Sequence, residues 1–329
     1  MGIVIKTGSS RDIRTIMDFL RQKTSFPLYI GFESPDIVRK VVARNIRANK
    51  KAFDNSDEHP LLMAYRKETD EPLGYLMLIL GLEESITDEV ESLILDYHVK
   101  ECPDRGMIIN MLLEEAERLS SQARCKYITH DLVLQLREEE QHFQNRGYRV
   151  DLNRIVKRIG TYTFDGPYQK QIKVRPARPN DLFFILNLNA ENSSFLIPAN
   201  RQVDCERIKK SFFETYADVD FAGDPFFRVL ISEDIEKKKP AGYIMIKLDV
   251  VDLVSVKPIA YIYDISVVQK YWGKFVGQRL VKEAENMLST LDIEYLVGDT
   301  AQSNPRPLKT AIRTLNFTHY SRRWIKETP

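Results

Sequence analysis

The stretch YIYDISVVQKYWGKFVGQRLVKEAENML, residues Tyr261–Leu288, changes its hydrophobic period near its middle. Its first part is rich in β-branched and aromatic residues, which favours a strand over Ile259–Val268. In its second part apolar residues recur at the spacing of a helix, at Val276, Leu280, Ala284, Met287 and Leu288. The stretch therefore predicts a strand, a loop with Gly273 and Gly277, and a helix.

This loop has the chemistry of an anion site. A helix N-terminus presents unpaired N–H groups, and glycine lets a phosphate approach the backbone closely. Lys270 and Lys274 would add positive charge beside the phosphate. The alternative is that Gly273 and Gly277 only shape an ordinary turn between a strand and a helix. The loop by itself leaves both interpretations open.

The same series of segments occurs twice in the chain. PLGYLMLIL at Pro72–Leu80 matches PAGYIMIKL at Pro240–Leu248, an offset of 168 residues. Other pairs follow in the same order at an offset of 168 or 169: ILDYHV with IYDISV, MLLEEAERL with RLVKEAENM, NRGY with TLNF, and RIVK with RWIK. A repeat of this length indicates a duplicated domain. We predict an N-terminal domain at 1–160, a linker at 161–171 and a C-terminal domain at 172–329.

Each copy is predicted to have the order β-α-α-β-β-β-α-β-α-β. In the second copy the strands are expected at Ile172–Ala177, Phe226–Ser232, Ala241–Val250, Ile259–Val268, Glu294–Val297 and Phe317–Ile325. The helices are expected at Asn180–Glu191, Val203–Tyr216, Val276–Leu288 and Pro305–Leu315. Three successive strands after two helices favour an α+β fold, with a mixed central sheet flanked by helices in each of two tandem copies.

Composition excludes several classes of protein. Lys and Arg total 48 against 47 Asp and Glu, so there is no strongly basic face for general nucleic-acid binding. The three cysteines lack disulfide or zinc spacing, which favours reduced thiols in a cytoplasmic protein. No apolar run approaches a membrane span, and MGIVIKTGSSRDI at the N-terminus does not have the pattern of a signal peptide.

The stretch from Tyr261 resembles the acetyl-coenzyme A binding segment of the GCN5-related N-acetyltransferases. Ile262, Ile265 and Val267 match that family's strand, and Gly277 matches the last residue of its Q/R-x-x-G-x-G/A loop. The matching helix is Arg279–Met287, and matches continue downstream at Tyr295–Gly298, Asn304, Pro305–Leu315 and Asn316–Phe317. The order of elements in both copies also resembles the family. The resemblance implies the acyl-coenzyme A N-acyltransferase fold, with acetyl-coenzyme A or another acyl-coenzyme A as co-substrate.

The resemblance also implies which residues bind the cofactor. They are Ile265, Val267, Trp272, Gly273, Lys274, Phe275, Val276, Gly277 and Asn304. Trp272 replaces the family's Gln or Arg, and Phe275 replaces its first Gly, which puts bulk beside the expected pyrophosphate. In the first copy the three signature positions hold Asp104, Met107 and Ile109. Because Asp104 would repel phosphate, we expect the first copy not to bind the cofactor.

The residues for catalysis are less distinct. Members of the family often use a Tyr on the last helix, but the matching positions here are Ile312 and Phe143. Tyr261 and Asp264 are the candidate catalytic residues near the end of the strand. The alternatives are packing for Tyr261 and a structural role for Asp264, which has a counterpart, Asp96, in the first copy. Acceptor-site candidates are Glu191 and Asn192, with solvated helix-end residues as the alternative.

The histidines do not predict a metal centre. His98 and His130 are expected on the two strands next to the usual cofactor cleft, where a metal or proton-transfer site is conceivable. They lack a Cys, Asp or Glu cluster at ligand spacing, so no metal site is predicted. The charged run at Glu138–His142 is interpreted as a solvated helix face.

The predicted function is that of an acyl-coenzyme A dependent N-acyltransferase. An acetyl group would pass to a primary amine of a small molecule or peptide by direct attack on the thioester, in the C-terminal domain. The two domains would pair within the chain, and no nucleic-acid, membrane or metal partner is expected. The alternative, favoured by the missing signature residues, is an inactive tandem binding or regulatory module.

Overall fold

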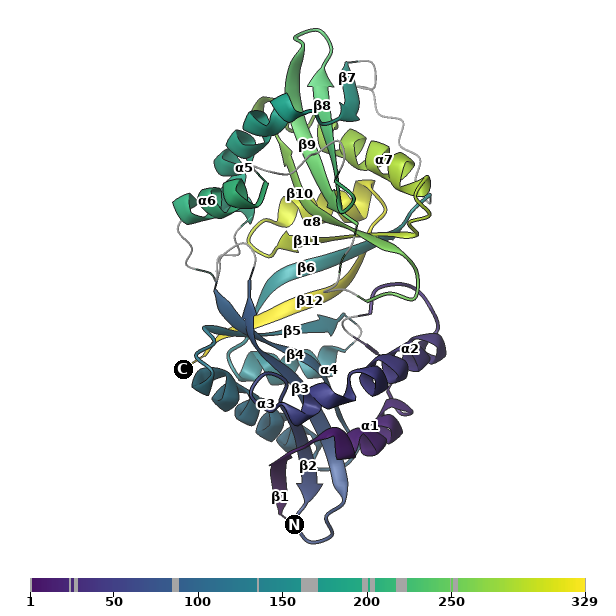
Figure 1. Ribbon diagram of the computed structural model, residues 1–329, viewed down its shortest axis with the longest axis vertical. Helices are drawn as coiled ribbons and strands as arrows, with labels where there is room; N and C mark the ends of the chain where they lie inside the picture. Colours follow the sequence, from purple (N-terminus) through teal and green to yellow (C-terminus); the bar gives the residue numbers. More distant parts are fainter. Residues whose placement is uncertain are drawn as a thin grey trace. The chain divides into compact units, whose positions relative to one another are not determined.

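A computed structural model describes residues 2–23, 25–26, 29–84, 89–134, 136–160, 171–196, 201, 205–216, 224–248, 250 and 254–328 (Figure 1). The chain forms two compact units, one of Met1–Val150 with Ser321–Pro329 and the other of Asp151–Tyr320. We call them the N-terminal and the C-terminal unit. All of the predicted linker except Gln171 lies outside the described residues.

The N-terminal unit is a six-stranded sheet with helices. Its sheet order is β1-β2-β3-β4-β5-β12, antiparallel except for the parallel pair β4–β5. Its strands are β1 (Ile3–Thr7), β2 (Leu61–Arg66), β3 (Pro72–Glu83), β4 (Val90–Val99), β5 (Tyr127–Val133) and β12 (Thr318–Glu327). Its helices are α1 (Ile13–Leu20), α2 (Pro35–Ala48), α3 (Arg105–Gln122) and α4 (Arg137–Asn145).

The C-terminal unit repeats this plan, with the sheet order β6-β11-β10-β9-β8-β7. Only the pair β10–β11 is parallel among its described strand pairs. Its strands are β6 (Arg149–Arg158), β7 (Ile172–Pro176), β8 (Phe227–Asp234), β9 (Lys239–Lys247), β10 (Ile259–Val267) and β11 (Tyr295–Ala301). Its helices are α5 (Leu182–Leu196), α6 (Cys205–Tyr216), α7 (Val276–Ser289) and α8 (Pro305–Thr314).

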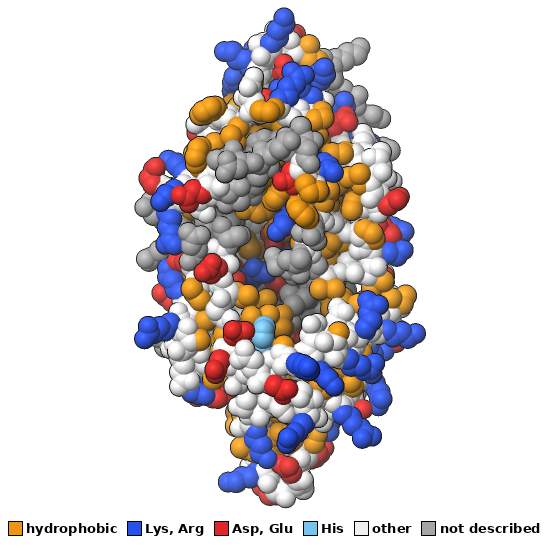
Figure 2. Space-filling view, viewed as in Figure 1, with side chains coloured by type: hydrophobic (Ala, Val, Ile, Leu, Met, Phe, Trp, Pro, Cys, Tyr) orange, Lys and Arg blue, Asp and Glu red, His pale blue; other side chains and the backbone are white. Residues whose placement is uncertain are grey.

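The element order confirms the predicted fold class. Apart from short 3-10 turns, both copies run β-α-α-β-β-β-α-β-α-β, with a mixed sheet flanked by helices. Among the described residues, no helix combines the length and apolar composition needed to cross a membrane. Figure 2 shows acidic and basic side chains interspersed over the visible face, as the near-zero net charge suggests.

Each sheet is covered on both faces. In the N-terminal unit Leu62 and Leu76 belong to the cluster that includes α3, whereas Met63 and Tyr75 belong to the cluster that includes α1 and α2. Successive side chains of a strand point to opposite faces, so β2 and β3 must be apolar throughout. This explains the unbroken apolar runs that revealed the repeat. In the C-terminal unit two clusters divide the faces in the same way.

The last strand of each repeat belongs to the unit of the other repeat. β6 follows α4 in the chain, but it pairs with β11 from Leu152–Ala301 to Arg158–Tyr295. β12 follows α8, but it pairs with β5 from Ser321–Val133 to Glu327–Tyr127. The units therefore differ from the predicted domains 1–160 and 172–329 in this one element each. The similar sequences RIVK and RWIK give either strand the residues to complete either sheet.

An ion pair attaches each exchanged strand to the long helix of its unit. The Lys157 ammonium on β6 donates to Glu285 of α7 at 2.8 Å, and Lys326 on β12 donates to Glu117 of α3 at 2.8 Å. Burial lowers the pKa of Lys157 and raises the pKa of Glu285. Because these residues match at the repeat offset, both copies use the same attachment.

Candidate active site

The parallel strands β10 and β11 separate toward their carboxyl ends. Their pairing runs from Ile259–Tyr295 to Ile262–Gly298, yet β10 continues to Val267 and β11 to Ala301. On its other side β10 pairs with β9, with an irregularity between Ile262 and Asp264. After Ile262, the backbone N–H and C=O groups on the open side of β10 are therefore not hydrogen-bonded to β11. Strands that part in this way can accept a ligand that hydrogen-bonds to the exposed backbone.

A tight loop leads from β10 to α7. Gly273 and Phe275 both have left-handed backbone conformations, with φ of 74° and 60°. Glycine accommodates this conformation easily, whereas Phe275, the residue before α7, is strained in it by about 1 kcal/mol. α7 begins directly after this turn, at Val276.

Gly277 lies in the first turn of α7 against β10. Among the described residues, a Cβ at this position would meet only Val267, at 3.8 Å from its Cγ2, which is an ordinary contact. The fold itself therefore does not require glycine at 277. An unpaired helix N-terminus with such open space suits the approach of an anion to the backbone. The structure thus brings together Val267 and Gly277, two of the predicted cofactor-binding residues.

Trp272 lies over the end of β10. Its indole Nε1 donates a hydrogen bond of 2.7 Å to the carbonyl oxygen of Val267, while its ring packs edge-on against Phe195 with centroids 5.9 Å apart. The side chain is 41% exposed, so it is not fixed by burial. Trp272 therefore occupies a backbone acceptor at the end of the strand that the predicted cofactor would follow.

Asp264 is buried on β10 at the irregularity. Its Oδ2 accepts hydrogen bonds from the Tyr243 hydroxyl on β9 and from the Asn189 amide on α5, the latter at 2.9 Å. Its Oδ1 has no partner in the described part of the chain. Burial raises the pKa of Asp264, although hydrogen bonds from Tyr243, Asn189 and the Ile265 backbone oppose the rise. A carboxyl group of this kind can exchange a proton with a bound ligand.

Tyr243 and Asn189 were not among the predicted site residues. The repeat offered a signal for the tyrosine, because PLGY and PAGY align Tyr75 with Tyr243. In the N-terminal unit the Tyr75 hydroxyl donates to Asp96 at 2.8 Å. Both copies therefore place a tyrosine on a carboxylate of the neighbouring strand, which is also compatible with a structural role.

Other predicted site residues lie apart from this group. Tyr261 is in the paired part of β10, and its hydroxyl donates to Asp299 at 3.1 Å. Asp299 also accepts two hydrogen bonds of 2.9 Å from Arg154 of β6, so Tyr261 belongs to a network across three strands. Asn304 precedes α8, and its backbone N–H donates to Ala301.

The remaining loop and helix residues are placed as follows. The Lys270 and Lys274 ammonium groups lie 5.1 and 5.6 Å from the centre of the Tyr271 ring. Val276 is buried in the core beneath α7, and Ile265 packs partly buried against the same core. Glu191 and Asn192 lie within α5, which continues to Leu196 and is longer than predicted.

In the N-terminal unit the three signature positions hold residues unlike those at the start of α7. Asp104 is the residue before α3, and Met107 is exposed. The side chain of Ile109, at the position matching Gly277, is fully buried in the core. The start of α3 therefore has a carboxylate where the start of α7 has the left-handed loop and an open glycine.

Comparison with known proteins identifies the fold family. Residues 194–311 match the model of the Acetyltransferase (GNAT) family. No curated protein matches the chain in sequence. Among solved structures, a GCN5-related N-acetyltransferase from Sphaerobacter thermophilus is similar with a TM-score of 0.56 at 12% identity, covering 99% of this chain and 96% of its own. At this identity the likeness concerns the fold alone.

A second solved structure shares the tandem arrangement. A tandem GNAT protein from the clavulanic acid biosynthesis pathway has a TM-score of 0.51 at 13% identity, covering 100% of this chain and 99% of its own. Both structures thus extend over the two repeats. Residues 194–311 match the GNAT acetyltransferase family in sequence, and the whole chain has the fold of these two solved structures.

Proposed function

We propose that the protein is an acyl-coenzyme A dependent N-acyltransferase, with acetyl-coenzyme A bound by the C-terminal unit. The observation that carries the proposal is the separation of β10 from β11 beside the open N-terminus of α7. The exposed edge of β10 would bind the amide groups of the pantetheine arm. The N–H groups at Val276 and Gly277 would bind the pyrophosphate. The fold supports this general chemistry, and the family match covers the same segment.

The acceptor would be a primary amine of a small molecule or peptide. Its nitrogen attacks the thioester carbonyl carbon, the C–S bond breaks, and the thiolate leaves as the amide forms. The second proton that the nitrogen then loses passes to the thiolate or to water. The ammonium form of the amine must first lose a proton. Asp264 is the candidate proton acceptor, because it is buried beside the open part of β10 and its Oδ1 is unpartnered among described residues. Tyr243 and Asn189 would hold the carboxyl group in place.

Trp272 favours the second candidate function, an inactive binding or regulatory module. Its hydrogen bond to Val267 uses the strand edge that pantetheine would need. A permanent bond of this kind would keep the cofactor out. The transferase proposal requires the exposed indole to move away when acetyl-coenzyme A binds.

Isothermal titration with acetyl-coenzyme A, followed by a thiol-release assay over a panel of amines, tests the proposal. We compare Gly277→Trp with Gly277→Ala, which adds only the ordinary contact with Val267. The alanine variant should bind and turn over, whereas the tryptophan variant should lose both while remaining folded. Absence of heat at millimolar acetyl-coenzyme A would refute the proposal. Binding without thiol release would favour the inactive module.

A further inference from the structure

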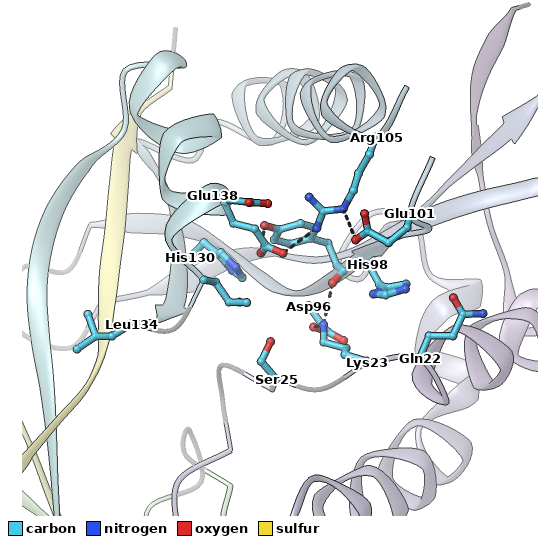
Figure 3. Close-up of a pocket in the computed structure, with 13 residues that line it drawn as sticks. Gln22, Lys23, Ser25, Asp96, His98, Glu101, Arg105, His130, Leu134 and Glu138 are labelled. Carbon is cyan, nitrogen blue, oxygen red and sulfur yellow. Dashed lines mark hydrogen bonds and ion pairs between the residues drawn. The ribbon is translucent and has the colours of Figure 1, made fainter. Parts of the chain in front are cut away.

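The N-terminal unit contains a cavity of about 660 Å³ at the carboxyl ends of β4 and β5 (Figure 3). These strands pair only from Glu91–Tyr127 to Ile94–His130 and then separate. The start of α3, α4 and the segment after α1 complete the wall. The cavity is lined mostly by polar groups: Gln22, Lys23, Ser25, Asp96, Tyr97, His98, Glu101, Arg105, His130, Glu138 and Glu139, with Leu134 and Leu136.

His130 gives this cavity an unsatisfied acceptor. The side chain is fully buried, and its ring stacks on Phe143 with centroids 5.2 Å apart. Nδ1 lies 2.8 Å from the carbonyl oxygen of Ile94, so Nδ1 must carry the proton and donate it. Burial lowers the pKa of His130, so Nε2 keeps its lone pair. This buried Nε2 has no partner among the described residues.

His98 supplies a second acceptor of the same type. Its Nε2 is also buried and unpartnered in the described structure. Burial, with Lys23 nearby, lowers the pKa of His98 to about 4, so the ring is neutral at neutral pH. Figure 3 shows the two imidazole rings on either side of the ion pair of Lys23 and Asp96. An unsatisfied buried acceptor is costly, and a ligand with N–H groups would remove that cost.

The charges of the wall favour a cation. Its four carboxylates, Asp96, Glu101, Glu138 and Glu139, face two cations, Lys23 and Arg105, which gives 2 − 4 = −2. Both cations are already paired. Lys23 donates to Asp96 and to the Tyr97 carbonyl at 2.7 Å.

Arg105 forms ion pairs with Glu139 at 3.0 Å and Glu101 at 3.2 Å. Glu138 is exposed at the rim and adds charge that neither cation neutralises.

We propose that this cavity binds a small organic ammonium compound, whose N–H groups donate to His98 and His130 while its charge is neutralised by the surplus carboxylates. Such a ligand combines directional donors with positive charge, which matches both features of the wall. In the part of the chain that is described, no three His, Cys, Asp or Glu side chains are arranged to hold a metal ion. The site is independent of the thioester chemistry proposed for the C-terminal unit.

Titration of the full chain with putrescine tests the proposal, with glycerol as a neutral probe and magnesium or zinc chloride as metal probes. His130→Phe removes one acceptor but keeps the aromatic stacking, and should weaken putrescine binding about 10-fold, as expected for one hydrogen bond to a charged donor. Glu138→Gln at the exposed rim should weaken it about 3-fold. Glu114→Gln, an exposed residue of α3 outside the cavity, is the matched control and should leave binding unchanged.

Thermal unfolding checks that each variant is folded, and if His130→Phe is not, the exposed Glu138 variant decides. Putrescine binding must persist in Gly277→Trp, because that substitution fills the proposed cofactor site of the C-terminal unit and leaves the cavity of the N-terminal unit unchanged. Absence of putrescine binding would overturn the proposal, as would an equal loss in the Glu114 control. Binding of a metal ion in place of putrescine would also overturn it. None of these results bears on acetyl-coenzyme A binding, so the two proposals can fail separately.

Discussion

Trp272 occupies one backbone acceptor at the end of β10. Its indole N–H is the group that holds the Val267 carbonyl oxygen, and a phenylalanine ring would keep the contact with Phe195 without this donor. Trp272→Phe should therefore bind acetyl-coenzyme A about 5-fold more tightly, since one hydrogen bond contributes roughly 1 kcal/mol. Calorimetric titration of both proteins measures the change. Weaker binding in the variant would show that the indole contributes to the cofactor site rather than obstructing it.

His98 predicts a pH dependence of stability. Its pKa falls from the usual 6.5 to about 4 in the folded protein, mainly because of burial. Above pH 6.5 the ring is neutral in both states and has no effect. As the pH falls from 6.5 toward 4, the unfolded chain takes up the proton first. The free energy of unfolding must then decrease, by at most about 1.4 kcal/mol per pH unit, which is the limit for a single proton.

Replacing His98 isolates this contribution from the other titrating groups. Urea unfolding of the wild type and of His98→Asn, measured between pH 7 and 5, should give a shallower pH slope for the variant. The buried His130 is present in both proteins, so its own lowered pKa cancels in the comparison. Parallel slopes would mean that His98 is protonated in the folded protein as easily as in the unfolded chain.

At the scale of elements, Lys157 and Glu285 connect an exchanged strand to the long helix of its unit. The Lys157 side chain is fully buried, so Lys157→Met leaves a buried carboxyl group without its cation. This substitution should lower the free energy of unfolding by about 3 kcal/mol. Glu285→Leu should have a similar effect. The double variant should lose clearly less than the sum, because it buries no unpaired charge.

Denaturant unfolding of the two single variants and the double variant measures the coupling. The exposed pair Lys209 and Glu206 on α6 serves for comparison, and Lys209→Met should change stability little. Additive losses for Lys157 and Glu285 would contradict the inferred pairing of β6 with α7.

For the whole molecule, the repeat made most of the architecture predictable. The hydrophobic period predicts the helices and strands of one repeat. The constant offset between the repeats then predicts the same order in the other, because two similar sequences must form two similar units. The partners of β6 and β12 could not be predicted in this way. RIVK and RWIK carry the same pattern, so either strand suits either sheet.

The candidate sites depend on side-chain positions, which the repeat does not predict. Gly277 could be proposed as a site residue from its place at the start of a helix that follows a strand, but the position of the Trp272 indole depends on a side-chain rotation. The expected placement of His98 and His130 on two adjacent strands is confirmed. That their Nε2 atoms have no partner among the described residues could not be foreseen, since it depends on burial and, for His130, on a hydrogen bond to the backbone of Ile94.

A crystal structure of the full chain soaked with coenzyme A tests the central proposal most directly. We expect the pyrophosphate at the backbone N–H groups of Val276 and Gly277, the pantetheine arm along the open edge of β10, and the Trp272 indole displaced from Val267. Density for the nucleotide elsewhere, or an unliganded α7 with Trp272 still bonded to Val267, would contradict the assignment of acyl transfer to the C-terminal unit.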